Sequence, residues 1–398
     1  MATLAGNLAA VRDNKQGNLA LLAGWLFAFR ICITLAFFRN DPSAGTAVIL
    51  AVSMALFIAS LGRWFMVGTI PRPECSLSAP MKWIVFYLAL LLISLSWSLT
   101  HSITVAIAYW LAMAADVGTV ALLISASTHN EGLDGLLSGF VIGSAMVAAL
   151  AWQLPSTADL RLGDEELLHP NAIGFEFALA ALCCFYLANK YRWANWAGAA
   201  LAITLLRTLS KASIAAFIAA AAYYLIREST LTTKIRVRIG ICVGVVLAVC
   251  WGLLEAYAEV YSQGTQAETL SGRTWIWATS LDIAMERPWL GHGFYSFRWV
   301  VPPFHDFEAW QAHNEILQQF FCYGILGVIA IFGLYWALFR QLRHTRQTRL
   351  AKLGTALLLF ALVRGLVDTE RFDLSFPLWL MSALSLSMTR EDALLPPA

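Results

Sequence analysis

Charged residues are scarce in this sequence. Only 13% of its 398 residues are Asp, Glu, Lys or Arg, whereas a soluble domain carries about 25%. Hydrophobic residues make up 59%, more than a water-soluble fold of this size can bury, so a soluble globular protein is excluded. We therefore predict an all-α polytopic membrane protein, with membrane lipids as partners and no nucleic acid.

The positions of the cysteines do not indicate a disulfide framework. The seven cysteines lie in apolar segments apart from Cys75 in a short loop, and none lies in 259–314. A cleavable signal peptide is not expected either, because Met1–Gln16 is polar and the apolar run after it is long enough to span a bilayer. Neither feature indicates a small secreted domain.

Long apolar runs are plentiful instead. A membrane-spanning helix needs roughly 20 mostly apolar residues. By that measure the sequence contains about twelve spans. They are 17–38, 44–62, 82–99, 102–126, 132–154, 171–189, 193–209, 211–227, 237–258, 315–339, 350–368 and 374–389.

One stretch, 259–314, is too polar and too interrupted to cross a bilayer. Lys and Arg are more numerous in the loops on the face of the membrane that holds the N-terminus than on the other face, which indicates that both termini are cytoplasmic. The stretch 259–314, between spans nine and ten, then lies outside, in the periplasm of a Gram-negative cell. The chain divides accordingly into spans one to nine (1–258), an outer loop domain (259–314), and spans ten to twelve with a cytoplasmic C-terminus (315–398).

Some cations break this bias and lie at the outer ends of spans. Arg207 and Lys211 flank a very tight outer turn, and Arg364 lies inside an apolar run. A cation in the hydrocarbon costs about 2.5–3.5 kcal/mol, so such residues are usually paired or functional. Two interpretations stay open for Arg364. It pairs with Asp368 one turn on and holds helices together, or it belongs to a cationic pocket for an anionic headgroup.

The segment 271–286 is predicted to be an amphipathic helix, because apolar residues recur at helical spacing and Pro288 stops it. With Ser271 as N-cap, Arg273 lies in the first turn, where backbone N–H groups and the helix dipole attract anions. Its guanidinium matches phosphate oxygens in two-pronged geometry. Arg273 is therefore a candidate phosphate ligand; the alternative is a solvated arginine on an exposed face.

Two histidines in the outer stretch differ in what the sequence indicates. Gly291-His292-Gly293 lacks the G-x-G-x-x-G pattern and is predicted to be a turn, with His292 structural. His313 precedes the tenth span, where a histidine can take or give a proton near neutral pH; the alternative is a histidine that hydrogen-bonds a helix end. The spacing of His292, His305 and His313 fits no zinc-ligand pattern, so no metal site is predicted.

Other outer loops add weaker candidates. After the fifth span, Arg161 and His169 are predicted to contact substrate, whereas the acidic run 164–166 is expected to form a solvated rim. We include Arg287 and Arg371 among the outer cations that are candidate substrate ligands.

Several short motifs follow one another along 271–340. They are Ser271-Gly272-Arg273 with Trp275, then Arg287-Pro288-Trp289-Leu290-Gly291-His292-Gly293, then His313-Asn314, then Tyr323-Gly324-Ile325-Leu326-Gly327. In this order and spacing they resemble the signature region of the bacterial O-antigen ligase/polymerase family. The large outer loop between spans nine and ten of twelve is similar to the layout of that family.

The resemblance implies a GT-C-type membrane glycosyltransferase without a cofactor, acting at the outer face of the bacterial inner membrane. Its donor would be a glycan on undecaprenyl pyrophosphate and, in the ligase branch, its acceptor a sugar of the lipid A–core oligosaccharide. By position, Arg273 matches the arginine and His313 the histidine of the family's outer loop. Asp368 lies near the family's acidic residue. Lys211 stands where the family has arginine, and Arg287 where it has asparagine, so Lys211 keeps the charge but loses the fork.

These observations combine in one mechanistic hypothesis. The leaving pyrophosphate would be neutralised without a divalent metal, by the outer cations Arg273, Lys211, Arg207 and Arg161. His313 would orient or deprotonate the acceptor hydroxyl, giving inversion at the anomeric carbon. Three alternatives stay open: a glycan polymerase of the same family, a protein O-oligosaccharyltransferase with the same donor, and a lipid-linked glycan transporter or flippase. We expect a monomer or a weak oligomer.

Overall fold

The protein is built from helices. The computed structural model describes residues 2–38, 41–67, 77–127, 131–154, 161–164, 168–227, 232–234, 237, 273–303, 308–345, 348–370 and 374–394, and these ranges contain no β-strand. The helices are α1 (Ala2–Phe37), α2 (Pro42–Val67), α3 (Ala79–Ser94), α4 (Ile103–Ala126), α5 (Glu131–Ala151), α6 (Pro170–Leu187), α7 (Trp193–Thr208), α8 (Lys211–Arg227), α11 (Arg273–Ala284), α12 (Phe297–Val300), α13 (Glu315–His344), α14 (Arg349–Gly365) and α15 (Leu378–Leu394).

Most predicted spans correspond to helices. Within the described ranges, six helices are long and apolar enough to cross a membrane: parts of α1 and α2, together with α4, α5, α6 and α13. The shorter α3, α7, α8, α14 and α15 each coincide with a predicted span. The span predicted over 237–258 lies almost wholly outside the described residues. The described part of the chain is therefore all-helical, consistent with a polytopic membrane protein, and the count of twelve spans stays a prediction.

Two helix boundaries differ from the prediction for local reasons. α3 begins before the predicted span 82–99, because the side chain of Ser78 caps its first turn. α15 begins after the predicted start of 374–389, because Ser375 N donates to the carboxylate of Glu315 at 2.8 Å instead of entering a helix. Hydrophobic periodicity carries no signal for hydrogen bonds of this kind.

α1 and α5 pack at close range through small residues. α5 carries Gly135, Gly139 and Gly143 at four-residue spacing, and all three face α1. A Cβ at Gly139 would lie 1.9 Å from the carbonyl oxygen of Leu21, so no larger residue fits without moving the helices. Small residues at this spacing let helices in lipid approach closely, and here they hold α1 against the bundle.

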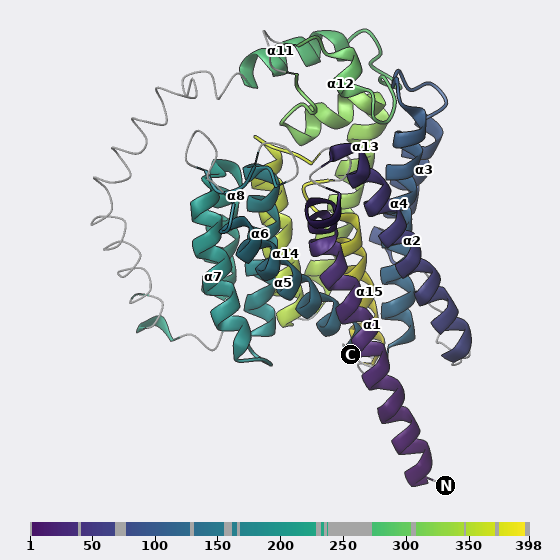
Figure 1. The fold of residues 1–398 in the computed structure, drawn as a ribbon, viewed down its shortest axis with the longest axis vertical. Helices are drawn as coiled ribbons and strands as arrows, with labels where there is room; N and C mark the ends of the chain where they lie inside the picture. Colours follow the sequence, from purple (N-terminus) through teal and green to yellow (C-terminus); the bar gives the residue numbers. More distant parts are fainter. Residues whose placement is uncertain are drawn as a thin grey trace.

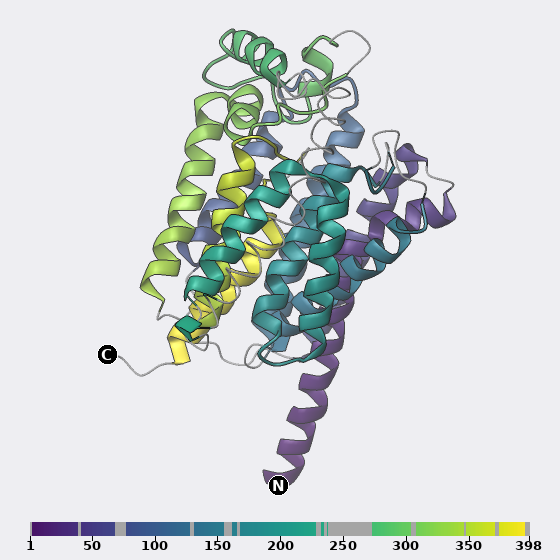
Figure 2. The same cartoon turned by 90° about the vertical axis from the view of Figure 1, so that its left-hand side faces the viewer.

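α11 and α12 cover one end of the bundle. In Figures 1 and 2 they lie across the top, whereas α1 starts and α15 ends at the bottom. The helices of the outer loop and the ends of the first and last helices thus lie at opposite ends of the molecule. The charge distribution predicts the same arrangement, with the termini and the stretch 259–314 on opposite faces of the membrane. The assignment of one face to the cytoplasm stays a prediction.

Close backbone contacts at two glycines join the turn after α11 to α13. α13 is interrupted at Gly324, whose φ of 60° is left-handed. A Cβ on Gly324 would lie 2.4 Å from the carbonyl carbon of Trp289, and one on Gly291 would lie 2.4 Å from the carbonyl carbon of Cys322. Backbone hydrogen bonds of 2.8–2.9 Å join the segment 288–293 to α13. The two glycine motifs of the sequence are therefore the two sides of one backbone contact.

Candidate active site

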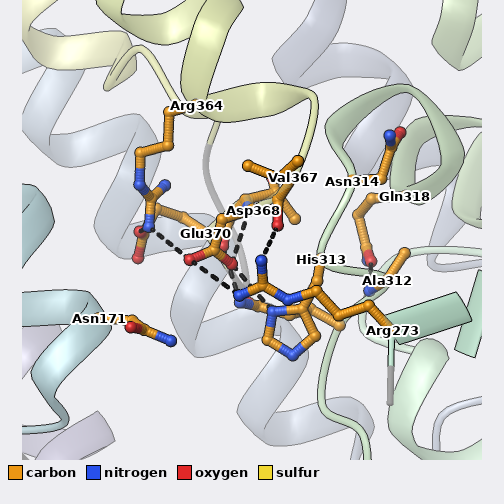
Figure 3. Close-up of polar contacts among 12 residues, drawn as sticks. Asn171, Arg273, Ala312, His313, Asn314, Gln318, Arg364, Val367, Asp368 and Glu370 are labelled. Atoms are coloured by element: carbon orange, nitrogen blue, oxygen red, sulfur yellow. Dashed lines mark hydrogen bonds and ion pairs between the residues drawn. The ribbon is translucent and has the colours of Figure 1, made fainter. Parts of the chain in front are cut away.

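Asp368 is the centre of a buried polar cluster, shown in Figure 3. It lies just past the end of α14 and is 1% exposed. Its carboxylate lies 2.9 Å from His313 Nδ1, 3.4 Å from Arg364 Nη2 and 3.9 Å from Arg273 Nη2. The backbone amide of Thr369 donates to it as well, at 3.1 Å. Segments that are far apart in the sequence therefore converge on one carboxylate.

His313 is held in an uncommon backbone conformation. Its φ is 50°, in the left-handed region that costs a residue other than glycine about 1–2 kcal/mol. Both neighbours are fixed: Ala312 N donates to Gln318 Oε1 at 2.7 Å, and the side chain of Asn314 caps α13. The turn thus directs the imidazole at Asp368. Strain that the surroundings maintain in this way is typical of functional residues.

Arg273 is the first residue of α11, which confirms a helix within the predicted segment 271–286. The helix ends at Ala284, and the predicted N-cap, Ser271, lies outside the described residues. Arg273 Nη1 donates to the carbonyl oxygen of Val367 at 2.5 Å. Only 19% of the Arg273 side chain is exposed, so it is not a solvated arginine on an open face. The guanidinium is oriented into the cluster, with part of its fork still accessible.

Arg364 is buried and its charge is balanced within the protein. Its Nη2 lies 3.4 Å from Asp368 and 2.7 Å from Glu370, and its Nε donates to Ser213 Oγ at 3.3 Å. Its guanidinium also lies over the ring of Phe175, 4.3 Å from the centroid. Of the two interpretations of Arg364, the pair with Asp368 is the one that the structure shows. Arg364 therefore holds Asp368 in place from the side opposite Arg273, as Figure 3 shows.

A second group of cations lies beside this cluster, around the turn between α7 and α8. Lys211 is close enough to Arg161 and Arg273 for their positive charges to act on it. Arg161 donates to the carbonyl oxygen of Thr208 at 3.1 Å and to Asn171 Oδ1 at 2.5 Å. We call Arg161, Lys211 and Arg273 the cationic group. It unites three of the predicted pyrophosphate ligands.

Arg207 and His169 lie next to the cationic group and have structural contacts. Arg207 is in the last turn of α7, and its carbonyl oxygen accepts from Leu162 N at 3.2 Å, which joins the loop to the helix. His169 is the N-cap of α6, and its Nδ1 accepts from Asn171 N at 3.3 Å. These bonds position the loop that carries Arg161; substrate contact by Arg207 and His169 stays a prediction.

Arg287 lies apart from the cationic group, so the two cannot share one pyrophosphate, and contact of Arg287 with the glycan stays a prediction. Arg287 is exposed in the turn after α11, at the far end of a helix of 12 residues that is about 18 Å long. Arg273 lies at the other end, so one ligand the size of a pyrophosphate cannot bridge the two. Arg371, the other predicted cation, lies outside the described residues.

His292 is a structural residue, as predicted. It is 2% exposed, its Nε2 lies 3.0 Å from the carbonyl oxygen of Ile283, and its ring packs on Phe321. Burial lowers the pKa of His292; the Ile283 carbonyl opposes this and the charge of Arg287 adds to it. Within the described ranges, no three His, Cys, Asp or Glu side chains are grouped as a metal site requires; His305 lies outside them.

Comparison with known proteins finds one family that part of the chain resembles. Residues 196–332 match a protein family described as O-Antigen ligase. Over this region the chain is similar to the O-antigen ligase family. The family covers O-antigen ligases and polymerases, which are membrane glycosyltransferase-like enzymes. No curated protein matches the chain.

The family region and the site overlap without coinciding. The region that matches the O-antigen ligase family contains Lys211, Arg273 and His313, three of the residues around the cluster. Arg161 precedes it, and Asp368 follows it. The fold therefore completes the site with residues from outside the matched region.

The contacts of Asp368 determine the hydrogen-bonding state of His313. Burial alone would raise the pKa of Asp368, but the charge of Arg364, the hydrogen bond and charge of His313, and the charge of Arg273 outweigh it, so the pKa lies well below its ordinary value. An ionised Asp368 accepts a hydrogen bond from His313 Nδ1–H, which leaves Nε2 as the acceptor nitrogen. The pair has the arrangement of a general base and the carboxylate that orients it.

Three polar residues that hold the cations were missing from the predicted site. They are Glu370 and Ser213, which contact Arg364, and Asn171, which contacts Arg161. Each stands two positions after a predicted site residue, namely Asp368, Lys211 or His169. The clustering of polar residues where a helix begins or ends could have identified all three.

Proposed function

We propose that this protein transfers an O-antigen glycan from undecaprenyl pyrophosphate to a sugar of the lipid A–core oligosaccharide, at the periplasmic face of the inner membrane. The observation that supports this best is the His313–Asp368 pair, 2.9 Å apart, beside the cationic group. A base next to positive charge suits a reaction in which a hydroxyl attacks and a pyrophosphate leaves.

His313 activates the acceptor in this mechanism. The acceptor hydroxyl gives its proton to His313 Nε2, and its oxygen forms a bond to the anomeric carbon of the donor sugar. The bond from that carbon to the pyrophosphate oxygen breaks on the opposite face, and the electron pair leaves with the pyrophosphate. A single displacement of this kind inverts the anomeric carbon. Asp368 is ionised, so its negative charge stabilises the imidazolium that forms on His313.

The cationic group stabilises the leaving group. Undecaprenyl pyrophosphate gains negative charge as the sugar leaves, and Arg273 and Lys211 would neutralise that charge. Arg161 is anchored by Thr208 and Asn171, so its charge is fixed before substrate binds. Cationic side chains therefore supply the charge stabilisation, and we propose a metal-independent reaction.

The test is glycan transfer by the purified protein in lipid nanodiscs. The substrates are undecaprenyl-pyrophosphate-linked glycan and lipid A–core, and the product is lipid A–core that carries the glycan. Arg273→Ala and His313→Ala should each abolish transfer. Arg343→Ala and His344→Ala are matched controls, because both residues are exposed at the other end of α13 and should transfer normally.

The outcomes separate the alternatives. A product in which two lipid-linked glycans are joined, with lipid A–core unmodified, would identify a polymerase instead. Movement of the donor across the bilayer without any transfer would identify a transporter. Full transfer by both site variants would rule out the proposed catalytic residues. Loss of activity in the presence of a chelator would contradict the metal-independent reaction.

A further inference from the structure

Glu315 is a buried acidic residue that the proposed mechanism does not use. It is the first residue of α13, two positions after His313, and only 3% of it is exposed. A carboxyl group held away from water needs hydrogen-bond donors to offset the loss of its hydration. Two donors satisfy one oxygen of Glu315, and they come from different segments of the chain.

The first donor is Tyr335, whose hydroxyl donates to Glu315 Oε1 at 3.0 Å. The two residues belong to the same helix but stand 20 positions apart, which would separate them by about 30 Å in a straight helix. They meet because α13 is broken at Gly324, so that its first part turns back toward the second. The hydrogen bond therefore fixes the first part of α13 against the second.

The second donor is the backbone amide of Ser375, which donates to the same oxygen at 2.8 Å. Ser375 stands seven residues after Asp368, so this bond anchors the connection between α14 and α15 beyond Asp368. The end of α14 packs on the other oxygen, because a Cβ added at Gly365 would lie 2.6 Å from Glu315 Oε2. Glu315 thus contacts the chain on both sides of Asp368.

These contacts connect Glu315 to the geometry of the base. His313 and Asp368 are joined by one hydrogen bond of 2.9 Å between two separate segments. Glu315 is close in sequence to His313 and contacts residues on either side of Asp368. Loss of its side chain would therefore let the two segments shift relative to each other. A displacement of about 1 Å can lower the rate of an enzyme about 10²-fold.

We infer that Glu315 is a positioning residue, which holds the segment that carries Asp368 at a fixed distance from His313. The inference rests on the proposed function, because the distance matters for turnover only if this pair activates the acceptor. Glu315 acts through its hydrogen bonds and does not touch substrate. Both of its donors are neutral groups, so an amide oxygen in the same place can accept the same two bonds.

Hydrogen exchange tests these contacts independently of activity. Backbone exchange is measured on the full-length protein in nanodiscs, in peptides that contain Ser375. Glu315→Ala should raise exchange of the Ser375 amide about tenfold, roughly the effect of losing one hydrogen bond. Glu315→Gln should exchange as the wild type does. Glu286→Ala is the matched control, because Glu286 is exposed just after α11 and its removal should leave this amide unchanged.

Steady-state kinetics of glycan transfer test the consequence for the reaction. In monodisperse protein, Glu315→Ala should lower kcat about 10²-fold, and Glu315→Gln should keep it within about threefold of the wild type. Tyr335→Phe removes one of the two donors and should have a smaller effect than Glu315→Ala. The donor KM should change less than threefold in all of them, because Arg161 is held by Thr208 and Asn171.

Several results would overturn the inference. Exchange of the Ser375 amide at the wild-type rate in Glu315→Ala would show that Glu315 does not anchor this segment. A kcat of Glu315→Gln as low as that of Glu315→Ala would show that the charge acts, and a wild-type kcat in Glu315→Ala would leave a structural role alone. If Glu315→Ala yields no monodisperse protein, Tyr335→Phe decides, and a wild-type kcat there rejects the proposal.

Failure of the proposed function gives a different result. A wild-type protein that transfers no glycan to lipid A–core would reject that function. The exchange of the Ser375 amide would still respond to Glu315→Ala and not to Glu315→Gln, so the anchoring of the segment after Asp368 would stand.

Discussion

His292 and His313 belong to the same polar stretch, on either side of α12, and have opposite surroundings. His292 lies in the glycine turn, packed on Phe321, with a backbone carbonyl as the partner of its Nε2. His313 occupies a strained turn at the mouth of α13, with the carboxylate of Asp368 as partner and cations nearby. The imidazole is the same in both, so the partner and the access to substrate decide what each can do.

The two turns therefore differ in role. The turn around His292 stabilises the fold, whereas the turn around His313 positions a candidate catalytic side chain. The glycine turn bonds backbone to backbone with α13 and thereby fixes one end of α11. In the turn around His313, the hydrogen bonds of the neighbouring residues hold the His313 side chain in position. We expect changes in the glycine turn to lower the amount of folded protein, and changes around His313 to lower turnover by folded protein.

The largest contrast is expected from alanine at the two histidines. His313→Ala removes the proposed base and should lower the rate of glycan transfer about 10³-fold, within the range for general base catalysis. His292→Ala should reduce the yield of folded protein but keep transfer per folded molecule within about threefold. Transfer rates are normalised to the monodisperse protein recovered. Equal losses per folded molecule would erase the distinction between the two turns.

Asp368→Asn should lower transfer about 10²-fold. The amide keeps the shape of the side chain but cannot hold the Nδ1 proton of His313 in the same way, so the imidazole loses its orientation and its charge partner. The measurement is the transfer rate per folded molecule. A rate equal to that of the wild type would argue that Asp368 does not orient His313.

On the structural side of the comparison, Gly324→Ala should destabilise the protein by about 2 kcal/mol or more. Its left-handed φ disfavours alanine, and the added Cβ would meet the backbone of Trp289. Gly62→Ala is the matched control, since a Cβ there meets nothing within 4 Å. Thermal unfolding in nanodiscs measures both variants. An unfolding midpoint for Gly324→Ala equal to that of the control would show that the glycine contact does not hold the turn.

Arg273→Lys should raise the KM for the donor about tenfold, since lysine keeps the charge but loses the two-pronged fork. The donor KM of Lys211→Arg, which supplies a fork, should stay the same or fall. Arg343→Lys at the far end of α13 controls for general effects of the exchange. A donor KM that does not respond to either exchange in the cationic group would place the pyrophosphate elsewhere.

The smallest effect is expected from the pH dependence of stability at His292. Its folded-state pKa is lowered by burial, so the folded protein binds that proton less readily than the unfolded chain. Neutral His292 therefore stabilises the folded protein fully at pH values above the ordinary histidine pKa of about 6.5, and this stabilisation declines as the pH falls below that value. Unfolding midpoints of the wild type should therefore drop between neutral and mildly acidic pH more than those of His292→Gln. Parallel curves would contradict the assignment.

The sequence predicted the helices better than the contacts between them. Apolar runs and the helical spacing in 271–286 give helix positions because they depend on local periodicity. Arg273 and His313 could be identified because each stands where a helix begins. Their meeting at Asp368 could not, since 55 residues separate Asp368 from His313 and no local pattern encodes that contact.

Arg287 shows that a sequence motif does not give the position of a side chain in the fold. It is a cation within a motif of the family signature, yet the length of α11 carries it away from the cationic group. The glycines around it were recognisable as a turn, but a turn signal does not say what the turn packs against. That partner, the break at Gly324, lies on another helix.

The burial of Arg364 has a consequence for how the chain enters the bilayer during synthesis. α14 must be inserted with an arginine in its last turn, where an unpaired arginine opposes insertion by up to about 2.5–3.5 kcal/mol, the cost at the centre of a helix. Asp368 leaves the ribosome only four residues later, so the ion pair can form within the same helical hairpin before the rest of the bundle closes. The carboxylate that orients His313 would then also determine whether the penultimate helix is accepted by the insertion machinery.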